Sequence, residues 1–127
     1  MTLSITPFQK GIGATITGID LSVQPDAATF AEIKTALDSH QLLSFPEQEL
    51  DATGQVAFAK QFGPLDIHVL EQYNHPDFPE IFMLSNEVVD GKPLGLSDAG
   101  SYWHSDFAFR PKPAYVTMLH AKKIPSQ

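Results

Sequence analysis

Apolar residues in the first part of the chain follow patterns that predict two short strands and a helix. Residues 3–5 and 12–19 are rich in β-branched side chains and punctuated by Gly and Pro, so they predict two strands joined by a turn near Gly11. After Asp26, apolar side chains repeat at helical spacing as far as His40. Asp26 is a suitable N-cap for this helix. The stripe that we expect to be buried comprises Phe30, Ile33 and Leu37.

A second strand-and-helix pattern follows in the middle of the chain. Residues 42–45 form a compact apolar run that ends at Pro46 and predicts a buried strand. Asp51 is placed to cap a second helix, and Gly63-Pro64 would stop it. The side chains expected on its inner face are Val56, Ala59 and Phe62.

The last part of the chain predicts two further core strands, over residues 81–84 and 115–121. Between them, residues 87–100 predict a long polar loop, a feature that is often functional in compact domains. The pattern as a whole predicts a mixed α/β domain whose helices pack on an antiparallel sheet. There is no internal repeat and no convincing boundary, so we expect a single partial domain over residues 1–127.

Composition and charge exclude several classes of function. The chain has 127 residues with 43% hydrophobic and 18% charged residues, which is typical of globular proteins. Its formal net charge of −7 argues against nucleic acid as a partner. Without Cys, neither a disulfide nor a Cys-ligated metal can form. No apolar run has the length of a membrane span, and residues 1–5 lack the features of a signal peptide. We therefore expect no membrane partner and a cytoplasmic location.

The candidate chemistry centres on His104 and Asp106, which are two residues apart. In an extended strand such residues point to the same side, so an imidazole and a carboxylate would converge. Non-haem Fe(II) oxygenases use two His and one carboxylate in this way. Trp103 and two phenylalanines give the segment apolar flanks. The alternative is a chance triplet, because His-x-Asp arises in about one chain in ten of this length and is weak evidence alone.

Several further motifs, in a fixed order, resemble the N-terminal part of the taurine dioxygenase family of Fe(II)/2-oxoglutarate-dependent oxygenases. The resemblance covers essentially the whole chain. It implies a mainly β domain with flanking helices, the incomplete N-terminal part of a double-stranded β-helix or jelly roll. The matching segments are residues 5–7, 12–14, 18–21, 58–65, 67–68, 103–106, 113 and 119–125.

The resemblance also implies roles for individual residues. His104 and Asp106 would be two of three iron ligands. We interpret Trp103 as support for His104 from outside the ligand set, and the alternative is a core aromatic. His68 matches a position that binds substrate. The alternative for His68 is a surface histidine that follows a turn. Taurine itself is disfavoured as the substrate, since Glu71 stands where taurine-type members have Tyr and Gly100 where they have Asn.

The family supplies its second iron-binding His and a 2-oxoglutarate-binding Arg from sequence beyond the position of Gln127. We therefore expect the chain to be a fragment that is inactive alone. The parent would be a dioxygenase that uses Fe(II), 2-oxoglutarate and O2 to hydroxylate a small organic acid. The expected substrate is a sulfonate, a sulfate ester or an aryloxyalkanoate. The carboxylate of Asp106 favours hydroxylation over halogenation. Whether the protein is a homo-oligomer stays open.

Two other classes of function compete with this interpretation. One is a catalytically inactive β-domain that binds a small ligand or a protein partner. The other is a hydrolytic metal site that uses His104 and Asp106. Iron-dependent consumption of 2-oxoglutarate would separate the dioxygenase from both.

Overall fold

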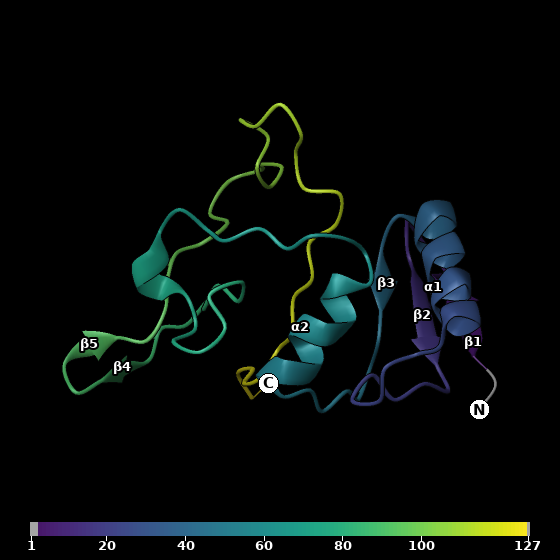
Figure 1. Cartoon of the computed structure of the whole chain (residues 1–127), viewed down its shortest axis with the longest axis horizontal. Helices are drawn as coiled ribbons and strands as arrows, with labels where there is room; N and C mark the ends of the chain where they lie inside the picture. Colours follow the sequence, from purple (N-terminus) through teal and green to yellow (C-terminus); the bar gives the residue numbers. More distant parts are fainter. Residues whose placement is uncertain (1–2, 127) are drawn as a thin grey trace. The chain divides into compact units, whose positions relative to one another are not determined.

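The computed structural model describes residues 3–126, which form two compact units (Figure 1). The first unit ends at Gln61 and holds β1, β2, α1, β3 and α2. The second begins at Phe62 and holds the 3-10 helix η1 and the strands β4 and β5. The expectation of one partial domain over residues 1–127 stays a prediction, because two compact units can still belong to one domain.

The first unit contains a three-stranded sheet in the order β1-β2-β3. β1 (Ser4–Pro7) and β2 (Ala14–Thr17) pair antiparallel, whereas β3 (Leu43–Ser44) pairs with β2 in parallel. The expectation of an antiparallel sheet is therefore wrong at β3. The cause is the intervening helix, which carries the chain back to the end of the sheet where β2 begins, as in other parallel crossovers.

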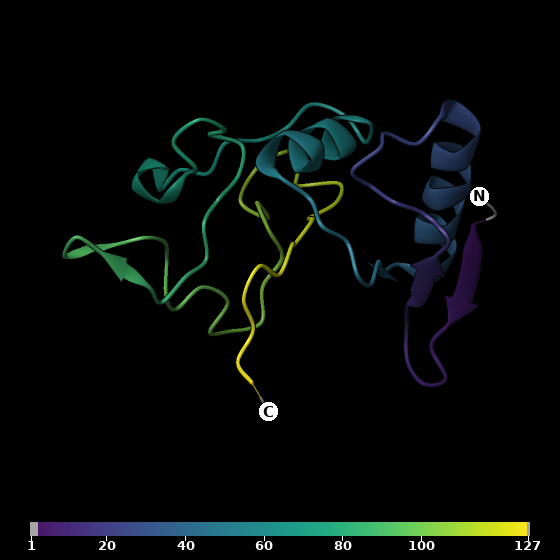
Figure 2. The same cartoon turned by 90° about the horizontal axis from the view of Figure 1, so that it is seen from below.

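Helix α1 (Ala27–His40) begins and ends where the sequence predicts and lies against this sheet (Figure 2). The Asp26 carboxylate accepts a hydrogen bond from the Thr29 N–H at 2.8 Å, which satisfies one of the unpaired amides of the first turn. At the other end, Gln41 adopts the left-handed conformation with φ 65°, and its N–H donates to the Leu37 carbonyl.

Helix α2 (Ala52–Lys60) is also capped as predicted, by Asp51 on the Gly54 N–H at 2.7 Å. Its inner face differs from the expectation. Val56 is buried as predicted, but Phe58, which was not predicted, is the large side chain at the centre of the packing. The Phe58 ring makes edge contacts with Phe30 at 6.3 Å and Phe45 at 6.1 Å between centroids, the geometry that aromatic pairs prefer.

The buried apolar side chains all belong to the first unit. In the part of the chain that the structure describes, the second unit contributes none of them. This core comprises Ala14, Ile16, Leu21, Ile33, Ala36, Leu50, Val56 and Phe58.

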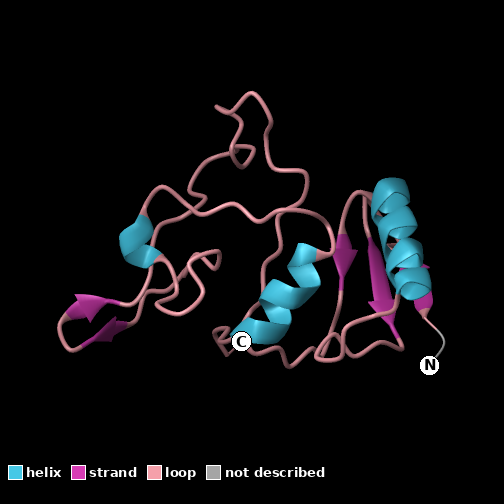
Figure 3. Ribbon diagram, in the orientation of Figure 1, coloured by secondary structure: helices cyan, strands magenta, loops and turns pink. Residues whose placement is uncertain are grey.

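The second unit is mostly loop (Figure 3). After η1 (Glu71–Tyr73), β4 (Val88–Val89) and β5 (Lys92–Pro93) form a hairpin inside the segment that was expected to be an irregular loop. Its turn residues Asp90 and Gly91 have φ values of 50° and 75°, as a type I′ turn requires. An Asp-Gly pair beside valines is a hairpin signal that the sequence contained.

The two core strands expected in this unit do not form. Residues 81–84 make only isolated bridges, Phe82 with Asn74 and Leu84 with Leu96, and residues 115–121 are irregular. A strand is stable only when another strand satisfies its backbone groups, and residues 3–126 provide no such partner for 115–121. The expectation of a mainly β domain is also wrong for the described residues, because the α-helices are longer than the strands. α1 alone has 14 residues, whereas β3, β4 and β5 have two each.

Among the described helices, none has the length and apolar character needed to cross a bilayer.

The Asp26 cap predicts how stability depends on pH. The hydrogen bond from the Thr29 N–H lowers the pKa of Asp26 below its usual value. A group with a depressed folded-state pKa stabilises fully above its unfolded-state pKa, and this contribution is lost as pH falls through the folded value. Asp26→Asn keeps a capping acceptor that does not titrate. We expect wild type to lose helicity more steeply than Asp26→Asn below about pH 4, the ordinary range of Asp. Urea unfolding followed by circular dichroism at several pH values measures this, and equal slopes would contradict it.

Apolar exposure in the second unit predicts self-association of the chain. Five large side chains there are each at least 74% exposed, and exposed apolar surface favours association. They are Tyr102, Trp103, Phe109, Leu119 and Ile124.

Size-exclusion chromatography with light scattering should show oligomers or aggregates of wild type. The double substitution Leu119→Ser and Ile124→Ser should shift the population towards monomer. Val23→Ser, at a 68% exposed position in the first unit, is the matched control and should change nothing. A monodisperse wild-type monomer would refute the expectation.

Candidate metal site

His104 and Asp106 lie beside each other in the second unit. The His104 Nε2 is 3.2 Å from Asp106 Oδ1, and the two side chains are 41% and 40% exposed. The two side chains are therefore close together, as predicted, but the extended strand that was expected to bring them together is absent from these residues. Asp106 begins a turn that runs to Phe109, and neither residue lies in a strand.

Hydrogen bonds decide which atoms of the pair face each other. The Tyr102 carbonyl lies 2.8 Å from His104 Nδ1. A carbonyl can only accept, so Nδ1 carries the proton and, in the neutral ring, Nε2 presents a lone pair. On the other side, the Thr117 hydroxyl donates to Asp106 Oδ2 at 2.6 Å, which leaves Oδ1 to face Nε2. Two acceptors therefore face each other, an arrangement that a proton or a cation between them would stabilise.

The spacing of these two acceptors suits a transition metal. Ligands about 2.1 Å from a divalent ion and at right angles to each other are about 3.0 Å apart. The observed 3.2 Å is close to this value. Nevertheless, residues 3–126 contain no group of three or more His, Cys, Asp or Glu side chains placed to hold a metal ion. The pair thus fits two protein positions of a metal site and leaves the others unfilled.

The aromatic ring beside His104 belongs to Tyr102, at 5.4 Å between ring centroids. The adjacent Trp103 was expected to support His104, but its side chain is fully exposed. Among the described residues, no contact carries that role for Trp103.

His68 is half-buried on an aromatic surface of the same unit. Its ring lies 3.9 Å from the Phe82 ring and 6.0 Å from the Phe107 ring, measured between centroids. The Leu70 N–H donates to His68 Nδ1 at 3.1 Å, so the proton of the neutral ring is on Nε2. His68 can therefore donate a hydrogen bond, whereas neutral His104 offers a lone pair.

Sequence reasoning missed Arg110, the only arginine of the chain. Its Nη1 donates to the Asp66 carboxylate, and its guanidinium lies 4.2 Å from the centroid of the Phe107 ring. The backbone N–H of Arg110 also donates to the Phe107 carbonyl at 3.0 Å. The sequence did contain a signal for Arg110, because it is a single arginine only four residues after Asp106. Thr117, the other missed residue, had none, because it was placed in an expected core strand.

Phe107 itself has a strained backbone, with φ 53°. A non-glycine residue in this region costs about 1–3 kcal/mol. A partly exposed ion pair contributes about 0.2–1 kcal/mol and an exposed cation–π contact about 0.5–1 kcal/mol. The contacts of Arg110 thus offset part of the cost of this turn.

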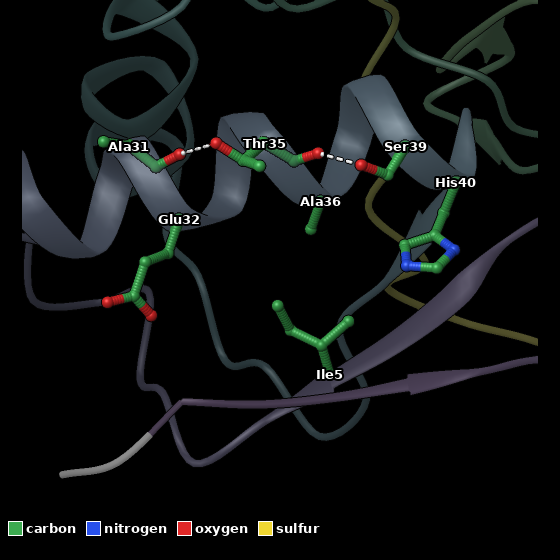
Figure 4. A pocket seen from close by; sticks show the side chains of 7 residues that line it. All are labelled: Ile5, Ala31, Glu32, Thr35, Ala36, Ser39 and His40. Carbon is green, nitrogen blue, oxygen red and sulfur yellow. Dashed lines mark hydrogen bonds between the residues drawn. The ribbon is translucent and has the colours of Figure 1, made fainter.

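A groove of about 380 Å³ lies between β1 and α1 (Figure 4). Ile5 of β1 lines it on one side, and α1 supplies the other lining residues. The hydroxyls of Thr35 and Ser39 donate to the carbonyls of Ala31 and Thr35 within the helix. These hydroxyls are therefore already engaged as donors, and nothing in the groove marks a reactive centre.

Comparison with known proteins identifies the family. The description "Taurine catabolism dioxygenase TauD, TfdA family" matches residues 4–127, so the chain belongs to this family. Its dioxygenases use Fe(II) and 2-oxoglutarate, and the solved structures that this chain resembles share the jelly-roll fold.

Relatives of known activity match nearly all of this chain. Pentalenolactone F synthase of Streptomyces arenae is 32% identical over 126 residues, which cover 97% of this chain and 42% of the synthase. The (S)-phenoxypropionate/alpha-ketoglutarate-dioxygenase of Delftia acidovorans is 33% identical over 136 residues, covering 98% and 44%. The chain thus spans less than half the length of these relatives.

A solved structure is similar as well. AAD-2 in complex with Mn(II) and N-oxalylglycine superposes with a TM-score of 0.60 at 26% identity. The match covers 89% of this chain and 34% of that one.

The hydrogen bonds predict opposite tautomers for histidines of the second unit. His104 should be protonated on Nδ1 when neutral, whereas His68 and His75 each accept a backbone N–H at Nδ1 and should be protonated on Nε2. Long-range proton–nitrogen correlation spectra of the imidazoles distinguish the two forms above the histidine titration range. The same tautomer on His104 and His75 would contradict the geometry.

Proposed function

We propose that this chain carries the N-terminal part of the iron site and substrate site of an Fe(II)- and 2-oxoglutarate-dependent dioxygenase. The observation that carries the proposal is the pair of facing acceptors, His104 Nε2 and Asp106 Oδ1 at 3.2 Å. In this proposal they occupy neighbouring positions on the iron. The contacts to the Tyr102 carbonyl and to Thr117 orient them, as outer-shell hydrogen bonds do in other metal sites.

The proposed substrate is a small organic acid of the aryloxyalkanoate type. His68 can donate its Nε2–H to an anionic oxygen, and the rings of Phe82 and Phe107 beside it offer an apolar surface to an aryl group. The relative from Delftia acidovorans is named for phenoxypropionate, which has both chemical features. A sulfonate or sulfate ester shares the anionic head and is the second choice.

Iron and 2-oxoglutarate, when bound, would supply the oxidation of the substrate by dioxygen. The residues of this chain hold two iron positions and orient the acid beside them. By the family resemblance, the third protein ligand and the arginine for 2-oxoglutarate come from sequence that follows the matched part. N-oxalylglycine in the solved neighbour supports the co-substrate, since its oxalyl group resembles the α-keto acid end of 2-oxoglutarate. We expect the 127-residue chain alone not to turn over 2-oxoglutarate.

Metal titration tests the assignment of the ligands. The chain should bind Mn(II) weakly and saturably, because two protein ligands leave water in the other positions. Asp106→Ala and His104→Ala should each weaken binding by at least about tenfold, the loss that removal of an outer-shell partner can produce. His75→Ala is the matched control, because His75 bonds locally to Asp77, and it should bind like wild type. Electron paramagnetic resonance of free Mn(II) gives the affinities.

Two outcomes would contradict the proposal. Unchanged binding in Asp106→Ala would remove Asp106 from the site. No saturable binding by wild type would favour the alternative of a catalytically inactive domain. In a full-length protein that contains this chain, Asp106→Ala should also abolish iron-dependent consumption of 2-oxoglutarate.

A further inference from the structure

Two segments that are distant in sequence are joined by an ion pair in the second unit. Asp66 and Arg110 are 44 residues apart, and the Arg110 Nη1 donates to the Asp66 carboxylate. Asp66 lies two residues before His68, and Arg110 lies four residues after Asp106. The pair therefore joins the segment of the proposed substrate contact to the turn of the proposed iron ligand.

Phe107 lies between the two sides of this connection. Its ring contacts the Arg110 guanidinium at 4.2 Å and the His68 ring at 6.0 Å, measured from the ring centroid. Its backbone is in the left-handed region, where a bulky residue is an outlier that surrounding contacts must hold in place. Arg110 supplies two such contacts, through its side chain and through its N–H on the Phe107 carbonyl, and the Phe109 ring lies 6.1 Å away between centroids.

We propose that Asp66 and Arg110 are positioning residues that fix His68 relative to the turn carrying Asp106. The ion pair holds the guanidinium, and the guanidinium lies over the Phe107 ring. The Phe82 ring and the Leu70 N–H hold one side of the His68 imidazole, and the Phe107 ring contacts it from the turn that carries Asp106. What His68 and Asp106 then do rests on the proposed function. The clamp itself, defined as Asp66, Arg110 and Phe107, does not.

The composition of the second unit explains why such a clamp is needed. Within residues 62–126, no large apolar side chain is fully buried, so no apolar core fixes the two segments. A lysine would replace Arg110 poorly, because a guanidinium is planar and presents five donors in a fixed fork, whereas an ammonium group is a compact, strongly hydrated charge on a flexible stem.

The first experiment needs no metal. In wild type, nuclear Overhauser effects should connect the rings of His68 and Phe107. Arg110→Lys, Arg110→Met and Asp66→Asn should each lose these cross-peaks. Lys123→Met is the matched control, because it removes another exposed ion pair of the same unit, with Glu87, and should keep them.

Retained amide contacts between Leu84 and Leu96 show that a variant has kept the fold of the unit. If Arg110→Met fails this check, Arg110→Lys and Asp66→Asn decide the question. Cross-peaks that survive in a folded Arg110 variant would overturn the proposal.

The second experiment separates positioning from mere stability. Mn(II) bound to wild type should broaden the resonances of both His104 and His68, and broadening falls steeply with distance from the ion. In Arg110→Lys, His104 should stay broadened while His68 sharpens. Equal broadening of His68 in wild type and Arg110→Lys would overturn the clamp. No broadening of His104 in wild type would contradict the proposed function instead. The cross-peaks between His68 and Phe107 would then still test the clamp.

Discussion

Burial of the Phe58 ring against Phe30 and Phe45 is the contact on which the first unit depends. It joins α2 to α1 and to the segment after β3, and it completes a core that also contains Ile16 and Ile33. Aromatic edge contacts of this kind add about 0.5–1.5 kcal/mol to the gain from burial. Both capped helices and the segment after β3 contribute a ring to this cluster.

The second unit is held by a different kind of force. Its described residues include no fully buried large side chain, so directional contacts define its geometry. The Tyr102 carbonyl orients His104, the Thr117 hydroxyl orients Asp106, and Arg110 bridges Phe107 and Asp66. The first two contacts orient His104 Nε2 and Asp106 Oδ1, which are 3.2 Å apart, although neither residue lies in regular secondary structure.

The histidines of this unit show how local backbone groups assign chemical roles. A carbonyl next to Nδ1 makes neutral His104 a lone-pair donor at Nε2, which is the form that metals bind. A backbone N–H at the same ring position makes His68 a hydrogen-bond donor at Nε2, which suits an anion. The surroundings of His68 are aromatic, with the Phe82 ring 3.9 Å from its own ring between centroids.

The sequence by itself determined the parts of the protein that depend on near neighbours. Both helices begin after the aspartates that cap them, because a cap and a periodic apolar stripe are local properties. The order of the motifs likewise identified the family, and the two-residue spacing of His104 and Asp106 led to the expectation that their side chains lie close together. Only the tertiary structure decided the parallel pairing of β3, the loss of a strand at residues 115–121 and the roles of Thr117 and Arg110. Each of these depends on a partner distant in sequence, Asp66 for Arg110 and Asp106 for Thr117, and no local pattern encodes where such a partner will lie.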